Sequence, residues 1–175
     1  ISKGKHVDPE VNGWSVNIKH IYDDPDLTMD PKRYSKKVVD LRNKLKTQPH
    51  VLLGDVVDFI PEKQNAYGKK ITVQKSSIYQ YVEIQDIGFG DFHCKEMRGW
   101  ELPSRAKHFS SAGDIYIGAI WGSAIKWCYI PDGIDNVVVT NGCFRCRVKA
   151  GMEKFTPDLL AYLNSEGWGV QMRAF

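Results

Sequence analysis

The sequence is poor in cysteine and contains no long hydrophobic run. Four cysteines in 175 residues are few for the disulfide framework of a secreted domain. No apolar stretch approaches the roughly 18 residues that a membrane-spanning helix needs, and the first residues contain no apolar signal segment. We therefore expect a cytoplasmic protein with reduced thiols and no membrane association. Because the chain lacks an initiator Met and stops abruptly, we also expect a piece of a longer protein.

A strong excess of charge of either sign is also missing. Lys and Arg number 24 against 21 Asp and Glu, which leaves a net charge of +3. The hydrophobic fraction of 42% excludes a disordered polyelectrolyte. A chain of 175 residues is long enough for one domain with a sizeable core. This mild basicity is compatible with a nucleic-acid partner but does not require one.

Common enzyme motifs are absent from the sequence. There is no P-loop, no H-E-x-x-H zinc motif and no G-x-S-x-G nucleophile elbow. The Asn/Asp-Pro-Pro-aromatic tetrapeptide of an amino-methyltransferase active site is missing as well. Cys143 and Cys146 have C-x-x-C spacing, but on the expected strand they point to opposite faces, which disfavours a shared metal. Zinc bound together with His93 or Cys94 is the less favoured alternative, and we expect no catalytic site, metal or cofactor in this chain.

Residues 31–46 carry the clearest helical pattern in the sequence. Asp30 is a suitable N-cap and Pro31 suits the first helical position. Apolar residues recur at spacings of four, three and four, and form a stripe that consists of Tyr34, Val38, Leu41 and Leu45. We predict a spacer-like helix over residues 31–49 that packs this stripe against a partner surface. Its basic faces favour exposure to solvent, and a position near DNA phosphates or an acidic partner is the less favoured alternative.

The remainder of the chain, residues 50–175, is predicted to form a β-rich domain. Strands are expected over 56–60, 79–85 and 113–120, and in a hairpin over 137–148. A short helix is expected to begin at Thr156 or Asp158 and to be interrupted by Gly167 and Gly169. The expected fold class is therefore α+β, with a β-rich domain, a helix before it and a short helix after it.

Residues 1–30 differ in character from the rest of the chain. They are polar and rich in turns, and they contain one plausible strand, Trp14–Ile18. We interpret them as an N-terminal extension or as the tail of an upstream domain.

Six short segments follow one another in a characteristic order. They are Leu53-Gly-Asp-Val-Val-Asp-Phe-Ile60, Tyr81-Val-Glu-Ile-Gln-Asp-Ile87, Leu102-Pro-Ser-Arg-Ala-Lys107, Gly113-Asp-Ile-Tyr-Ile117, Val138-Val-Thr-Asn-Gly-Cys-Phe144 and Leu159-Leu-Ala-Tyr-Leu-Asn-Ser165. The set resembles the target recognition domain of the specificity (S) subunit of type I restriction–modification systems. The similarity covers about residues 28–175, and the Cys143 between Gly142 and Phe144 departs from the family pattern.

The resemblance implies a sequence-specific DNA recognition module without catalytic residues. Its partners would be double-stranded DNA, a DNA methyltransferase subunit or domain that acts on adenine, and in some systems a restriction (nuclease/translocase) subunit. S-adenosylmethionine would be the cofactor of the methyltransferase partner. Candidate DNA-binding residues are Ser104 and Arg105 of the Pro-Ser-Arg-Ala segment, together with the basic residues Lys69, Lys70, Arg98, Lys107 and Lys126. For Arg105, a structural ion pair that ties its loop to the body is an equal alternative.

Two departures from the family leave alternatives open. An intact S subunit has two recognition domains and two long spacer helices, whereas this chain has one such domain. Residues 1–30 also do not resemble the start of an S subunit. The chain could instead be the C-terminal part of a single-chain N6-adenine DNA methyltransferase/restriction enzyme, or a β-rich protein-interaction domain that never touches DNA.

Overall fold

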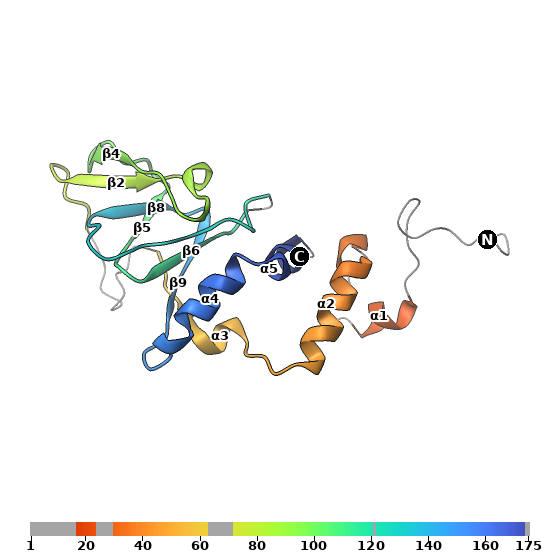
Figure 1. The fold of residues 1–175 in the computed structure, drawn as a ribbon. Helices are drawn as coiled ribbons and strands as arrows, with labels where there is room; N and C mark the ends of the chain where they lie inside the picture. Colours follow the sequence, from red (N-terminus) through yellow and green to blue (C-terminus); the bar gives the residue numbers. More distant parts are fainter. Residues whose placement is uncertain (1–16, 24–29, 63–71, 121, 174–175) are drawn as a thin grey trace. The chain divides into compact units, whose positions relative to one another are not determined.

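The computed structural model describes residues 17–23, 30–62, 72–120 and 122–173 (Figure 1). The chain divides into two units. The first unit comprises Ile1–His50 and Val170–Phe175, and the second comprises Val51–Gly169.

The first unit is helical where it is described. Helix α1, Ile18–Tyr22, begins after Asn17, whose side chain accepts a hydrogen bond from the Lys19 amide at 2.9 Å. The predicted strand Trp14–Ile18 is therefore wrong at its described end, and its other residues lie outside the described part of the chain.

The helix predicted over 31–49 is two helices. Asp30 caps the 3₁₀ helix η1, Pro31–Tyr34, by accepting from the Lys32 amide at 3.0 Å. Ser35 then leaves the helical region with a ψ of 148°, and α2 follows as Lys36–Thr47. The chain therefore restarts its helix at Lys36 instead of continuing from Pro31, and the Ser35 side chain makes no capping hydrogen bond. The predicted stripe spans the break, and it consists of the buried Tyr34 and Val38 and the half-buried Leu41 and Leu45.

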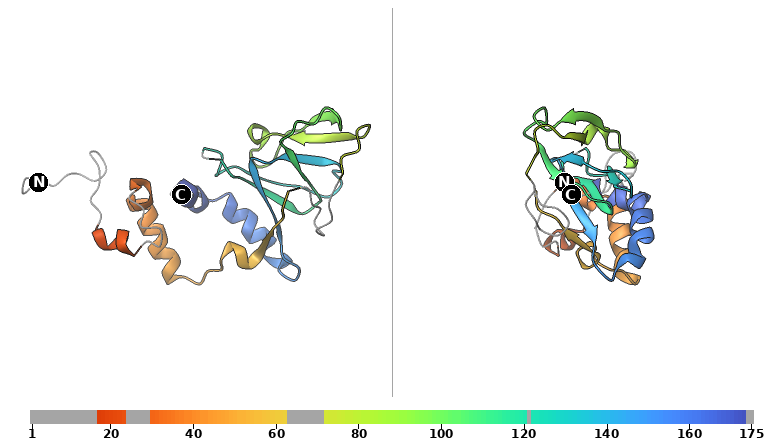
Figure 2. Two further views of the ribbon diagram at one scale, coloured as in Figure 1. Left: turned by 180° about the vertical axis from the view of Figure 1, so that it is seen from behind. Right: turned by 90° about the vertical axis from the view of Figure 1, so that its left-hand side faces the viewer.

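The second unit contains two mixed β-sheets. The first has the strand order β1-β9-β6-β7-β3, and these strands are Val57–Phe59, Cys143–Val148, Asp114–Gly118, Trp127–Tyr129 and Phe89–Gly90. The second has the order β4-β2-β8-β5, and these strands are Lys95–Arg98, Ile78–Val82, Val137–Thr140 and Ala106–Phe109. Figure 2 shows both sheets from two further directions. The fold class predicted from the sequence, α+β with a β-rich body, is confirmed.

The helical elements of this part of the chain are short. They are α3, Leu53–Val56; η2, Ile84–Asp86; η3, Glu153–Phe155; α4, Thr156–Leu163; and α5, Glu166–Arg173. The Leu-Gly-Asp segment forms a helical turn that leads into β1, which begins at Val57 within the strand predicted over 56–60. Gly167 and Gly169 lie within α5, so the predicted interruption is wrong. The break falls at Ser165, whose hydroxyl accepts from the Trp168 amide at 3.2 Å and so caps α5.

The main core lies between the two sheets and is centred on β8. Val137 and Val139 pack with Tyr116 and Cys128 of the other sheet. Val138, which points the opposite way, packs in a second cluster that includes Tyr81. Because both faces of β8 are buried, the strand has to lie inside its sheet with a paired strand at each edge. Other side chains must also pack against each of its two faces.

This requirement explains why the hairpin predicted over 137–148 does not form. β8 pairs in parallel with β2 and antiparallel with β5, whereas β9 pairs with β1 and β6 in the other sheet. Asn141 and Gly142 connect the two strands and carry the chain from one sheet to the other. A two-residue connection usually joins paired strands, but here the burial of Val137, Val138 and Val139 on both faces of β8 favours pairing with β2 and β5.

The cysteines differ sharply in exposure. Cys94 is exposed, while Cys128, Cys143 and Cys146 are buried, and all four are free thiols. Burial raises the pKa of the Cys143 thiol and of the Cys146 thiol to about 12.

Within the described residues, no three His, Cys, Asp or Glu side chains are grouped as a metal site would require. The same residues contain no helix with the length and apolar character needed to cross a membrane.

We expect only Cys94 to react with a chromogenic disulfide reagent in the folded protein at mildly alkaline pH. Buried thiols with a raised pKa contain almost no thiolate, which is the reacting species. The Cys94→Ser variant should show no fast phase, and denaturation should expose the remaining thiols of this chain. Rapid modification of Cys143 or Cys146 in the Cys94→Ser variant would contradict the packing described above.

Candidate nucleic-acid interface

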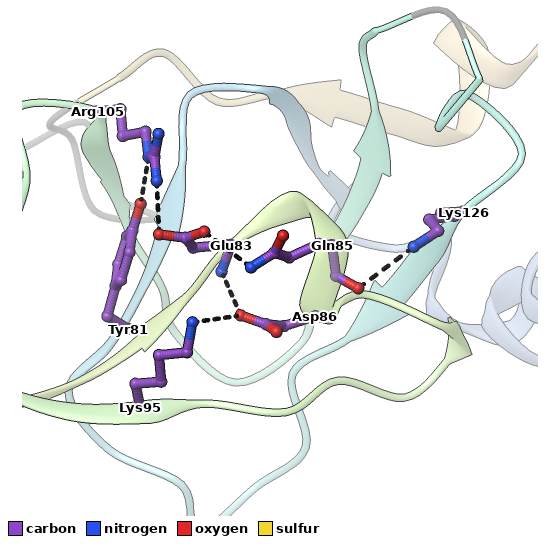
Figure 3. Close-up of polar contacts among 7 residues, drawn as sticks. All are labelled: Tyr81, Glu83, Gln85, Asp86, Lys95, Arg105 and Lys126. Atoms are coloured by element: carbon purple, nitrogen blue, oxygen red, sulfur yellow. Dashed lines mark hydrogen bonds and ion pairs between the residues drawn. The ribbon is translucent and has the colours of Figure 1, made fainter.

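A tight 3₁₀ turn, η2, follows the end of β2 and carries several polar side chains (Figure 3). Glu83 and Asp86 cap this turn reciprocally: the Asp86 carboxylate accepts from the Glu83 amide at 3.4 Å, and the Glu83 carboxylate caps the Asp86 amide. The Asp86 amide also donates to the Glu83 carbonyl at 3.0 Å. Two mutual caps satisfy backbone groups that a short helix otherwise leaves unpaired, so the turn has a defined shape although its surface is exposed.

Arg105 ties this turn to the strand and loop beside it. Its Nη2 donates to Glu83 Oε1 at 2.6 Å, and its Nε donates to the Tyr81 hydroxyl at 3.2 Å. The hydrogen bond to Glu83 raises the pKa of Arg105, so the guanidinium remains charged. The carbonyl of Arg105 also accepts from the Asn141 amide at 2.9 Å. Arg105 thus forms the structural ion pair that was one of the two alternatives, and 55% of its side chain stays exposed.

Two lysines complete the arrangement around the turn. Lys126 Nζ donates to the Gln85 carbonyl at 3.4 Å, and Lys95 Nζ lies 3.8 Å from Asp86 Oδ2. Gln85 Nε2 donates to Glu83 Oε2 at 3.2 Å. We refer to these residues as the turn cluster, which consists of Tyr81, Glu83, Gln85, Asp86, Lys95, Arg105 and Lys126. Its cations outnumber its carboxylates, which suits a surface near phosphates.

The connections from three other parts of the chain pack beside the turn. A methyl group on Gly142 would lie 3.3 Å from Ile120 Cδ1 and 3.4 Å from Ile84 Cδ1, so these side chains approach its backbone closely. The Ala119 amide donates to the Gly142 carbonyl at 2.9 Å. The β6–β7 loop, the β8–β9 connection and the loop that precedes β5 therefore form one surface with η2.

The structure brings together some of the predicted DNA-binding residues and separates others. Arg105 and Lys126 belong to the turn cluster, and Ser104 is exposed directly beside Arg105. Lys107 is half-buried at an irregularity in the pairing of β5 with β8.

Arg98 lies away from this group. It pairs with Ile78 at the beginning of β2, whereas Tyr81 and Lys95 pair near the end of that strand and Glu83 follows it. At about 3.3 Å per residue, the length of β2 places it roughly 15 Å from Glu83. Lys69 and Lys70 lie outside the described residues.

The sequence analysis missed Tyr81, Glu83, Gln85, Asp86 and Lys95 as members of one site. A signal was present, because Tyr81 and Glu83 are two residues apart on an expected strand and therefore share a face. Both belong to the Tyr-Val-Glu-Ile segment, and Arg105 belongs to the Pro-Ser-Arg-Ala segment. Two of the six motifs therefore meet in a single contact.

A third motif, Gly-Asp-Ile, serves the interior of the domain. Asp114 is fully buried on β6 and accepts from Arg145 Nε at 2.8 Å and from Arg147 Nε at 3.0 Å. The Ser111 amide donates to the same carboxylate at 2.7 Å. Both arginines lie on β9, and Arg147 is directly opposite Asp114 in the sheet. The side chains of Asp114 and Arg145 are fully buried, so this ion cluster links β6 to β9 inside the domain.

Comparisons with known proteins find similarity between this chain and solved structures. No protein-family model matches the sequence, and no curated protein matches it. An HsdS subunit from Thermoanaerobacter tengcongensis is 22% identical over 56% of this chain and 24% of its own, with a TM-score of 0.43. A chain from a structure that describes complex assembly and conformational transition of the type I R-M system is 23% identical, with a TM-score of 0.50. That match covers 66% of this chain and 29% of the other.

The fold defines the class of this domain. It is an α+β, β-rich domain whose fold is similar to part of a chain in a structure of the type I R-M system. The fold that the resemblance of the six motifs implies is thereby confirmed. The matched part spans less than a third of the other chain.

Proposed function

We propose that this chain is the sequence-specific DNA recognition module of a cytoplasmic type I restriction–modification system. Its role would be to direct an adenine methyltransferase, and in some systems a restriction subunit, to a target sequence. The fold shared with a type I R-M chain is the observation that carries this proposal. S-adenosylmethionine would be bound by the methyltransferase subunit or domain, and this chain would contribute no catalytic residue.

The turn cluster is the part of the domain that fits such a role best. Lys95 and Lys126 present positive charge from two different segments. Contacts of this kind with phosphates fix the register of a protein on the duplex, while polar side chains in the groove read the bases. The half-buried Leu41 and Leu45 of the predicted stripe are the candidates for contact with the methyltransferase.

A salt titration of DNA binding tests this proposal. We expect the full-length protein to bind a labelled duplex at low salt, with an affinity that falls linearly on a log–log plot as salt rises. Lys126→Ala should weaken binding to all duplexes about equally and reduce the slope by about 1, because one phosphate contact is lost. Fluorescence anisotropy measures both quantities.

Lys154→Ala is the matched control, since Lys154 lies on η3 outside the turn cluster and its ammonium is over the Phe155 ring. This variant should leave the slope unchanged. Absence of duplex binding at the lowest salt would favour the alternative of a protein-interaction domain.

A further inference from the structure

We propose that Gln85 reads an adenine in the major groove, and that Glu83 and Arg105 position its side-chain amide. This inference rests on the proposed function, because it names the residue of the recognition module that senses a base. It concerns a residue outside the set of candidates that the sequence predicted.

The amide of Gln85 is held in one orientation. Its Nε2 donates to Glu83 Oε2 at 3.2 Å, and the side chain is exposed. An ionised carboxylate only accepts hydrogen bonds, so the nitrogen end of the amide must face Glu83. The second hydrogen on Nε2 and the oxygen Oε1 are then left as a donor and an acceptor side by side. Adenine presents the complementary pair in the major groove, an acceptor at N7 and a donor at N6, and bidentate contact with glutamine is a common readout of this base.

The carboxylate that orients Gln85 is itself fixed. Arg105 Nη2 donates to its other oxygen at 2.6 Å, and Arg105 Nε is held by the Tyr81 hydroxyl. The Arg105 charge also neutralises Glu83, which would otherwise repel the DNA backbone. Because Nε and Nη2 form one donor edge of the guanidinium, this edge is already occupied and Arg105 serves as a positioning residue.

The backbone of Gln85 is restrained as well. Lys126 donates to its carbonyl from the β6–β7 loop, and the mutual caps of Glu83 and Asp86 lie on either side of it. A reading residue needs such support, since a base contact tolerates only small displacements. Asn141, the other exposed amide on this surface, is held through its backbone alone among the described contacts. Gln85 is therefore the better candidate.

The experiment compares base preferences of variants in the full-length protein within its native assembly. A random-sequence duplex pool is first selected with the wild-type protein, and each position of the selected target is then replaced in turn. We expect Gln85→Ala to lose about 5- to 150-fold discrimination at one A·T pair. Discrimination at every other position, affinity for non-specific DNA and thermal stability should remain as in the wild type. Gln74→Ala, an exposed glutamine beyond the other end of β2, is the control and should keep the full preference.

Arg105→Ala tests the positioning role. It should reduce discrimination at the same A·T pair, and the double variant with Gln85→Ala should be no worse there than Gln85→Ala alone. Equal weakening on all duplexes, additive with Gln85→Ala, would instead make Arg105 a phosphate contact and would overturn its positioning role. Sequence-specific binding with undiminished discrimination in Gln85→Ala would overturn the assignment of Gln85 while the proposed function stands. Failure of the wild-type protein to select any sequence would count against the proposed function itself.

Discussion

Replacing Asp114 with Asn should remove about 3–5 kcal/mol from the free energy of unfolding, which is a large part of the stability of a domain this size. The variant keeps the shape of the side chain but removes its charge. Asp114 is fully buried and faces both Arg145 and Arg147, and the Arg145 side chain has no exposure to water. A buried guanidinium that loses its carboxylate cannot regain hydration without opening the sheet, and this desolvation is the source of the cost.

Urea denaturation followed by circular dichroism measures this effect. Asp58→Asn is the control, because Asp58 is 71% exposed and lies 4.0 Å from Lys149. Exposed pairs of this kind contribute about 0–1 kcal/mol, so the control should unfold near the wild-type midpoint. A loss below about 1 kcal/mol in Asp114→Asn would show that the buried ion cluster does not stabilise the pairing of β6 with β9.

Replacing Gly118 with Ala should destabilise the domain by about 1–3 kcal/mol and weaken DNA binding at the same time. A Cβ at this position would collide with the backbone carbonyl oxygen of Ser123 and lie 2.7 Å from its carbonyl carbon. Backbone atoms cannot rotate away as a side chain can, so the β6–β7 loop must move. The Ser123 carbonyl accepts from the Lys126 amide at 2.8 Å, and displacement of Ser123 therefore displaces Lys126 from Gln85.

Thermal unfolding and anisotropy on a target duplex, recorded on the same preparation, test both parts of this prediction. Gly54→Ala is the matched control, since a methyl group on Gly54 would meet no atom within 4 Å and the residue belongs to α3. That control should be neutral or gain up to about 1 kcal/mol from helix propensity. Wild-type stability together with wild-type affinity in Gly118→Ala would contradict the close approach of the loop to β6.

The sequence was sufficient for the fold class because its signals were local. Asp30 and Pro31 mark a helix start, and in the segment 113–120 a turn leads into a run of strand-forming residues. The pairing of strands was not local. The two-residue connection at Asn141 and Gly142 suggested a hairpin, and the burial of the three valines of β8 on both faces explains why β8 and β9 separate.

The candidate site was only partly predictable, because local sequence motifs identify single residues but not the contacts between distant segments. Arg105 was identified through its motif, but its partners Tyr81 and Glu83 are more than 20 residues away in the chain. No spacing rule relates a strand end to a loop that far along the sequence. Gln85 had no signal of its own, since an exposed glutamine in a turn is ordinary until the carboxylate that orients it is known.

The reciprocal caps of η2 join the side chains of Glu83 and Asp86 to backbone amides, and the Gln85 side chain adds one hydrogen bond to the Glu83 carboxylate. The caps themselves therefore do not require a glutamine at position 85. A single codon change there can alter the preferred base while the framework beneath persists. Under the proposed function, a substitution at this position changes the base that the domain prefers and leaves its fold intact.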